Sequence, residues 1–294
     1  MISKGRLLSL SMLIALGMLW GSGYVIAKYC VTHGVPALGY SFWQSLGPAI
    51  ALTIISLWQQ HKVPIKKKYL AYYGVCGLLG IAFPNSLMYF SARYVPAGIL
   101  AVLVNTVPII TFPLALAAKQ DKFSWLKITA VLIGVAGILW IVTPHELATD
   151  NLHWGWTLAV LLTPLSFAIC AVFISACRPV PSHAIGLSAG MLIFSSIILL
   201  PIVISQHAFY ALTWPFDLTQ WLILLEILLS STGYVLFFAL IRRAGPTFYS
   251  LVSGVVALTG LFWGRIIFGE SLSITNIAAI VLVITAIIMI TYER

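Results

Sequence analysis

One carboxylate lies deep inside an apolar stretch of this sequence. Glu226 is the one acidic residue well within the predicted helical span Asp217–Ile241, roughly 10 Å from its outer end. Ionisable side chains are costly in lipid, and those within apolar spans usually face a cavity or another helix. Glu226 is therefore a candidate to carry a proton or to bind a cation. The alternative is that Glu226 forms a fixed ion pair with Lys28, Arg93 or Arg265. The two interpretations do not exclude one another.

Aromatic and polar residues recur at helical spacing around this carboxylate. Ser230 and Tyr234 follow Glu226 at intervals of four, and Trp20, Tyr24 and Lys28 share one face in the same way. Together with similar residues in other spans they predict an aromatic-lined cavity with a few amide and hydroxyl groups, the usual composition of a small-molecule site. The further candidates are Gln44, Asn85, Tyr89, Asn105, Phe167, Tyr249 and Ser253.

The same residue types also serve structural purposes. Trp and Tyr often mark the membrane interface, and Asn and Ser within spans often bond only to a neighbouring helix. Gly74, Gly77 and Gly80 predict a close-packing helix surface rather than a site.

The elements that would position these residues are membrane-spanning helices. The 294-residue chain is 61% hydrophobic and only 8% charged, whereas a soluble domain carries roughly a quarter charged residues. Each recurrent apolar run is near the ~20 residues that cross a bilayer. The ten predicted spans are Leu7–Val31, Pro36–Trp58, Tyr69–Ser91, Val95–Ala118, Phe123–Thr143, His153–Ala176, Ser182–Gln206, Asp217–Ile241, Pro246–Phe268 and Ser273–Tyr292.

The basic residues set the orientation of these spans. Thirteen of the sixteen Lys and Arg residues fall on the side of the N-terminus and three on the opposite side, which places both termini in the cytoplasm. The net charge of +9 therefore reflects topology and not a nucleic-acid partner. The sequence predicts a multi-pass protein of the cell inner (cytoplasmic) membrane, compatible with a monomer.

The stretch Ser91–Val142 recurs with an offset of 149 positions. Arg93 falls on Arg242 and Asp121 on Glu270, and the order of charge, proline, helix, acidic turn and helix is kept. The predicted units are residues 1–143 and 153–294, joined by an outer loop at 144–152. With five helices per unit, the second enters the membrane from the opposite side. Such inverted 5+5 repeats are typical of transporters that alternate access to a central site.

Other chemistry is not indicated. No Gly-rich loop carries the Lys and Ser/Thr of a P-loop, and the six His residues fall at loops or span ends. The four cysteines show no CxxC spacing, which argues against a metal site or a disulfide framework. We therefore expect no catalytic residues, no metal, no cofactor and no enzyme activity.

Three motifs resemble those of the drug/metabolite transporter superfamily, EamA-type branch. The run Leu19–Lys28 resembles its first-helix motif, Ser91–Gly98 its junction between helices three and four, and Phe268–Leu272 its acidic turn before the last helix. The likeness covers essentially the whole chain. It implies a secondary transporter of small metabolites, often an exporter of amino acids, with a cavity formed chiefly by helices one, three, four, six, eight and nine.

The sequence departs from that family pattern in two places. Gln44 stands where many members carry an Arg, which puts anion recognition by the second helix in doubt. The first acidic turn lacks the usual Gly-Glu, although Asp121 still supplies the acid. The leading hypothesis is export of amino acids or related metabolites, facilitated or coupled to protons through Glu226. The alternatives are efflux of lipophilic cations and, remotely, a membrane scaffold that transports nothing.

Overall fold

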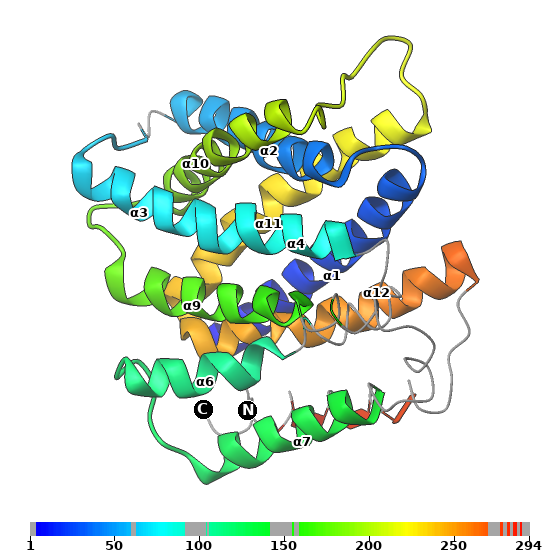
Figure 1. The fold of residues 1–294 in the computed structure, drawn as a ribbon. Coiled ribbons are helices and arrows are strands. Elements are labelled where there is room, and N and C mark those ends of the chain that lie inside the picture. The colour runs from blue at the N-terminus through cyan, green and yellow to red at the C-terminus, as the bar shows by residue number, and fades with distance from the viewer. Residues whose placement is uncertain are drawn as a thin grey trace.

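The computed structural model describes residues 4–59, 63–91, 104, 106–141, 155, 159–269, 277–278, 281–282, 285–286 and 289. Throughout these residues the regular secondary structure is helical (Figure 1). The helices are α1 (Lys4–Thr32), α2 (Ala37–Trp58), α3 (Lys67–Gly77), the π-helical segment η1 (Leu78–Ala82), α4 (Phe83–Ser91), α6 (Val107–Ala117), α7 (Trp125–Ile141), α9 (Leu162–Cys177), α10 (Ala184–Ser205), α11 (Leu218–Ser250) and α12 (Val252–Phe268).

Four helical stretches are long and apolar enough to cross a membrane, namely Gly5–Thr32, Lys67–Ser91, Ala184–Ser205 and Leu218–Ser250. Shorter apolar helices accompany them, so the chain is a helical membrane protein. The first three predicted spans coincide with helices to within a few residues. The start of the fourth predicted span, the span ends next to the predicted 144–152 loop, and most of the tenth predicted span lie outside the described residues.

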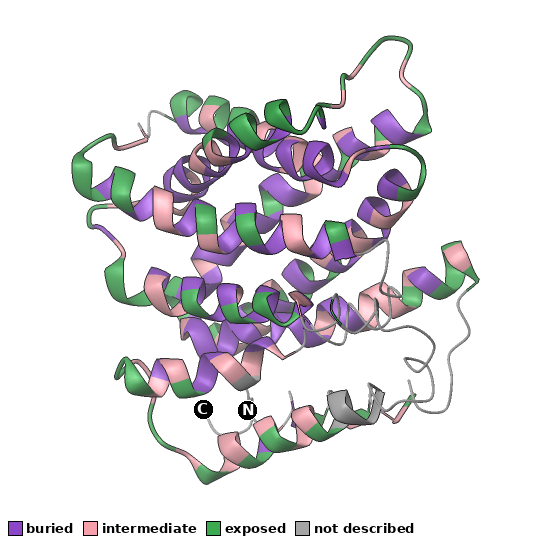
Figure 2. Ribbon diagram, viewed as in Figure 1, coloured by how far each residue is buried: buried purple, intermediate pink, exposed green. Residues whose placement is uncertain are grey.

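Helices from the two parts of the chain pack against one another. The contacts of α2 are mainly with α10, those of α1 are with α11 and α12, and both α4 and α6 contact α9. Figure 2 shows buried residues concentrated where α1, α2, α10 and α11 meet, while α7 is mostly exposed or intermediate. The interior is therefore lined jointly by helices that precede and follow residues 144–152.

The third predicted span is not a uniform α-helix. Five residues, Leu78–Ala82, form one π-helical turn, and Pro84 follows after Phe83. Proline lacks the N–H of a regular helical bond, and π turns insert an extra residue that rotates the face of the helix beyond them. Asn85 and Tyr89, both on α4, share the buried face that results.

The boundary between the eighth and ninth predicted spans lies within α11, at its one non-helical residue, Gly245 (φ 82°, ψ 170°). The helix before this kink runs three residues beyond the predicted end at Ile241, and the helix after it begins at Pro246, as predicted. Glycine adopts this positive φ without steric cost, and Pro246 then restarts the helix with its missing N–H at a helix start. The break places Tyr249 beyond the bend.

Close contacts between helices depend on particular glycines. A Cβ on Gly77 would lie 2.7 Å from the Met191 carbonyl oxygen and 2.8 Å from the Ser195 nitrogen, both backbone atoms of α10. The same addition at Gly74 would meet nothing closer than Phe194 at 3.6 Å. Of these two predicted packing positions, only Gly77 requires the absence of a side chain.

Candidate functional site

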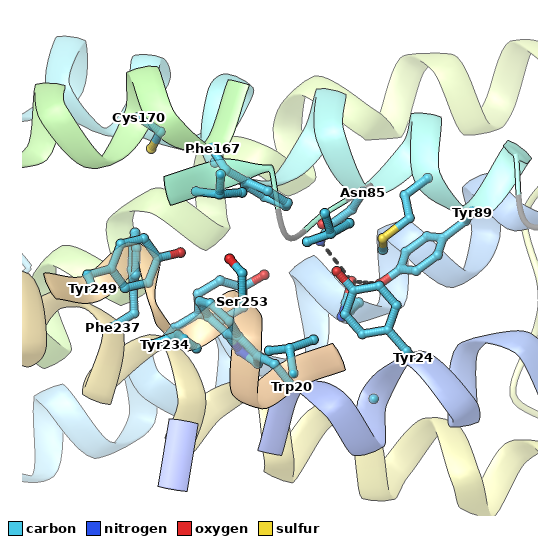
Figure 3. A pocket seen from close by; sticks show the side chains of 18 of the residues that line it. Trp20, Tyr24, Asn85, Tyr89, Phe167, Cys170, Tyr234, Phe237, Tyr249 and Ser253 are labelled. Carbon is cyan, nitrogen blue, oxygen red and sulfur yellow. Dashed lines mark hydrogen bonds between the residues drawn. The ribbon is translucent and has the colours of Figure 1, made fainter. Parts of the chain in front are cut away.

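A central cavity lies between α1, α2, α4, α6, α9, α10, α11 and α12 (Figure 3). Its volume of about 70 Å³ corresponds to about five to seven water-sized groups, at ~10–15 Å³ each. Ten of the residues predicted from sequence line it: Trp20, Tyr24, Gln44, Asn85, Tyr89, Phe167, Glu226, Tyr234, Tyr249 and Ser253.

One end of the cavity is a box of aromatic rings. The Trp20 ring centroid lies 5.9 Å from that of Tyr234, 5.8 Å from that of Phe237 and 6.3 Å from that of Tyr249. Phe237 and Tyr249, which flank the bend in α11, are 4.8 Å apart. Edge-to-face and tilted pairs at such distances stabilise one another beyond simple burial. At this end of the cavity the faces of aromatic rings can bind an apolar or cationic group.

The other end carries the carboxylate. Glu226 is 3% exposed, and its Oε1 accepts hydrogen bonds from Ser230 Oγ at 2.8 Å and from Gln44 Nε2 at 3.1 Å. Gln44 Oε1 in turn accepts from Asn85 Nδ2 at 3.0 Å and from the Tyr89 hydroxyl. Figure 3 shows Asn85 and Tyr89 converging with dashed hydrogen bonds at this end. The network joins α2, α4 and α11.

The two oxygens of the carboxyl group are in different situations. Glu226 Oε2 is buried and has no hydrogen-bond partner among the described residues. Gly23 on α1 lies against both oxygens, because a Cβ built there would be 2.8 Å from Oε1 and 2.9 Å from Oε2. The glycine thus provides the space in which the carboxylate lies beside α1.

The remaining sequence candidates are placed away from the cavity lining. Ser230 lies behind the carboxylate as its hydrogen-bond donor. Lys28 Nζ lies 4.4 Å from the centre of the Phe268 ring, and Arg265 is exposed in the last turn of α12. Asn105, like Arg93, lies outside the described residues. The described donors to Glu226 are Gln44 and Ser230, neither of them the basic partner weighed from sequence.

The structure adds lining residues that were not candidates. Gly23, Gly80, Met88, Val104, Val107, Cys170, Met191, Phe237, Val252 and Val256 complete the wall. Phe237 was detectable, because it continues the Glu226 face at i+11, and Cys170 follows Phe167 by three residues. Met191 and the valines carry no signal, since an apolar cavity residue in an apolar span resembles any lipid-facing one.

This arrangement suits non-covalent recognition of a small molecule. A buried carboxylate attracts a proton or a cationic nitrogen, amides and hydroxyls orient polar groups, and the rings pack against an apolar portion. No group of three or more His, Cys, Asp or Glu residues that could hold a metal occurs in the part of the chain that was described.

Comparison with known proteins now identifies the family. The model of the EamA-like transporter family matches residues 7–143 and 154–292, nearly the whole chain. The chain belongs to the EamA-like transporter family. It is therefore a membrane transporter of small molecules and not an enzyme, which confirms those sequence predictions and the resemblance.

Curated relatives of this EamA-like chain also carry transporter names. It is 27% identical over 283 residues to the uncharacterized transporter YoaV of Bacillus subtilis (strain 168), covering 95% of both chains. It is 28% identical over 292 residues to the uncharacterized inner membrane transporter YedA of Escherichia coli (strain K12), covering 96% of this chain and 90% of YedA. A solved crystal structure matches all of both chains with a TM-score of 0.72 and 14% identity, a likeness of fold alone.

Proposed function

We propose that this EamA-like protein exports amino acids or related small metabolites through its central cavity by alternating access, either with proton coupling or by facilitated movement. The observation that carries the proposal is a buried carboxylate, Glu226, at one end of an aromatic cavity. An amine on the substrate would bind Glu226 Oε2, the oxygen without a described partner. The carboxylate of the substrate would meet neutral groups such as Ser253 Oγ, because Lys28 and Arg265 do not line the cavity.

The volume of the cavity favours a small cargo. About 70 Å³ leaves room for a few non-hydrogen atoms by the water-sized measure, well below the ~300–1,000 Å³ of sites for drug-sized ligands. An amino acid with a short side chain is of this order.

Alternating access requires two halves that exchange roles around the site, and we propose the inverted 5+5 arrangement with both termini in the cytoplasm. The two segments matched by the family model support it. A second support is the hydrogen bond between Ser45 Oγ on α2 and Ser195 Oγ on α10, 2.9 Å long. These serines are 150 positions apart, one more than the offset of the repeat, and residues that a repeat relates, or their immediate neighbours, touch only near a two-fold axis.

The location follows from the same architecture. The bias of Lys and Arg to one side and the name of YedA as an inner membrane transporter support the inner (cytoplasmic) membrane. Nothing in the packing of the described helices requires a second copy for the cavity to form, so we propose a monomer.

A second candidate is efflux of small organic cations. It is favoured because the described cavity lining holds a carboxylate and several aromatic rings but no Lys, Arg or His. Such a site binds a positive charge more readily than a zwitterion, whose carboxylate would lack a charged partner.

Transport by the purified protein in proteoliposomes tests both candidates. Vesicles loaded with radiolabelled amino acids are followed for efflux with and without a pH gradient, and a parallel set is loaded with methylammonium. Efflux of a subset of amino acids supports the first candidate. Efflux of methylammonium alone moves the conclusion to cations, and efflux of neither contradicts both.

A further inference from the structure

The Glu226 carboxylate is held asymmetrically. Both of its hydrogen-bond donors, Ser230 Oγ and Gln44 Nε2, reach the same oxygen, Oε1. Oε2 is buried, has no partner among the described residues, and belongs to a side chain that lines the cavity. A buried acceptor without a partner costs free energy. A proton or a hydrogen-bond donor of a ligand would therefore be stabilised most at this oxygen.

The amide of Gln44 is fixed in one orientation by its neighbours. Asn85 Nδ2 can only donate, so the group that it meets on Gln44 is the oxygen. The Tyr89 hydroxyl donates to the same oxygen. Rotating the amide by half a turn would set the Gln44 NH₂ against the Asn85 NH₂ and its carbonyl oxygen against the carboxylate. The Gln44 NH₂ is therefore committed to Glu226 Oε1.

We propose that Gln44 is the positioning residue that occupies Glu226 Oε1 and reserves Oε2 for a single positive charge, which is either a proton or the primary ammonium group of a substrate. Proton and substrate then exclude one another at one atom, so release of one accompanies binding of the other. This rests on the proposed function, which supplies the substrate, and deepens it by naming the atom and the kind of exchange.

Several features suit this atom to a proton or an ammonium group rather than a metal ion. Metal cations such as Ca²⁺ need several oxygen ligands, whereas Oε2 has no described partner and the cavity is lined largely by aromatic and apolar side chains. A primary ammonium gains from one carboxylate and adjacent ring faces. Tyr24 and Tyr234 line the same cavity as Glu226 and can supply such faces.

The titratable groups that interact electrostatically with Glu226 are of types that are neutral at physiological pH. They are the phenols of Tyr40, Tyr89 and Tyr234 and the thiol of Cys30. Tyr24 and Cys170 also line the cavity, and in the described part of the chain no Lys, Arg or His does so.

Infrared spectroscopy of the purified full-length protein tests the proposal without any transport. The absorption of a protonated carboxyl group is followed through a pH titration and assigned by its loss in Glu226→Gln. Methylammonium chloride is the probe, and sodium chloride at the same concentration is the control. We expect methylammonium to abolish the protonated signal near its midpoint and to shift that midpoint to lower pH, while sodium does not.

Gln44→Met tests the positioning role. It removes the donor to Oε1 with little change in side-chain volume, and the charged form loses one charge-assisted hydrogen bond. The titration midpoint should then rise by about one pH unit, a tenfold change in proton affinity. Tyr89→Phe, which removes one of the two bonds that orient Gln44, should shift it less in the same direction. Gln220→Met, at a buried glutamine outside the lining, is the matched control.

The outcomes separate this inference from the proposed function. A carboxyl signal that never appears, or that methylammonium leaves unchanged, overturns the shared site at Oε2. If the titration midpoint of the carboxyl group is the same in Gln44→Met and Tyr89→Phe as in the wild type, the role of Gln44 is overturned. Failure of amino-acid efflux in proteoliposomes, with these shifts observed, overturns only the proposed amino-acid cargo.

Discussion

Gly23 lies so close to Glu226 that a Cβ on the glycine would be 2.8 Å from Oε1 and 2.9 Å from Oε2. Gly23→Ala therefore forces the end of the carboxylate side chain to move, which the flexible Glu can do without unfolding the helix pair. We expect a transport rate at least tenfold lower, with a melting temperature within a few degrees of the wild type.

The control for this prediction is Gly74→Ala, because a Cβ there meets only Phe194 at 3.6 Å. Both variants add one methyl group to a helix, so their difference isolates the position of the carboxylate. Normal transport by Gly23→Ala would show that the contact with α1 does not matter to the site.

Glu226→Gln keeps the size of the side chain and removes its charge. Because Ser230 and Gln44 both donate to Oε1, the neutral amide can still accept at that position and the fold should persist. We expect the response of transport to a pH gradient to disappear and methylammonium affinity to fall at least tenfold. Efflux rates measured in proteoliposomes across a range of pH check this, and an unchanged pH profile would contradict it.

Helix packing at Gly77 gives a prediction about stability. An added Cβ would lie 2.7 and 2.8 Å from backbone atoms of α10, which cannot rotate away. Gly77→Ala should therefore lower the free energy of unfolding by about 1–3 kcal/mol. Gly74→Ala, one turn earlier on α3, should be neutral or slightly stabilising because Ala favours a helix by up to about 1 kcal/mol. Thermal unfolding in detergent compares the two, and equal melting temperatures would argue against this contact.

The turn between α6 and α7 predicts a dependence on acid. Partial burial alone would raise the pKa of the Asp121 carboxyl, but hydrogen bonds from Lys127 Nζ at 2.6 Å and from the Lys122 N–H at 2.8 Å hold that pKa below its ordinary value. A depressed folded-state pKa contributes stability above the unfolded-state value near ~4, and this is lost as the pH falls through the folded-state value.

Asp121→Asn should accordingly lower the free energy of unfolding at neutral pH by about 1 kcal/mol, the upper end for exposed ion pairs, because both side chains of this pair are largely buried. The difference in melting temperature between variant and wild type should shrink as the pH falls below ~4. A difference that stays constant down to pH ~3 would show that Asp121 acts through something other than its charge.

Most of the fold was accessible from the sequence because the constraints of a bilayer are severe. Apolar runs near the spanning length located helices such as α1 and α10 to within a few residues. Local departures from a regular α-helix were harder to predict. Nothing in the apolar run before Pro84 signals a π-helical turn. The break at Gly245 is different, because the Gly-Pro sequence marks it and the next helix begins at the predicted Pro246.

The candidate site was accessible where polarity marked it. Glu226, Asn85 and Gln44 stand out as polar groups in apolar spans, and the structure brings them into one network. The sequence gives no measure of distance between spans, so it suggested basic partners for Glu226 where the structure has the amide of Gln44. Helix spacing relates residues within one span only, and contacts such as that of Gly23 depend on how helices cross.

The contact between Ser45 and Ser195 gives a test of the proposed symmetry. Their hydroxyl oxygens are 2.9 Å apart on α2 and α10, so cysteines at both positions, with the four native cysteines replaced by alanine, should form a disulfide on mild oxidation. Halves that rock about an axis move least at the axis itself, and the cross-linked protein should therefore retain at least half of its transport. Ile54 and Ile197 are exposed and line a separate groove between the same two helices. Cysteines at these two positions are the control for cross-links between α2 and α10 that form away from the serine contact. Complete loss of transport in the oxidised serine-site variant, restored by reduction, would mean that α2 and α10 separate during the cycle and that the axis lies elsewhere.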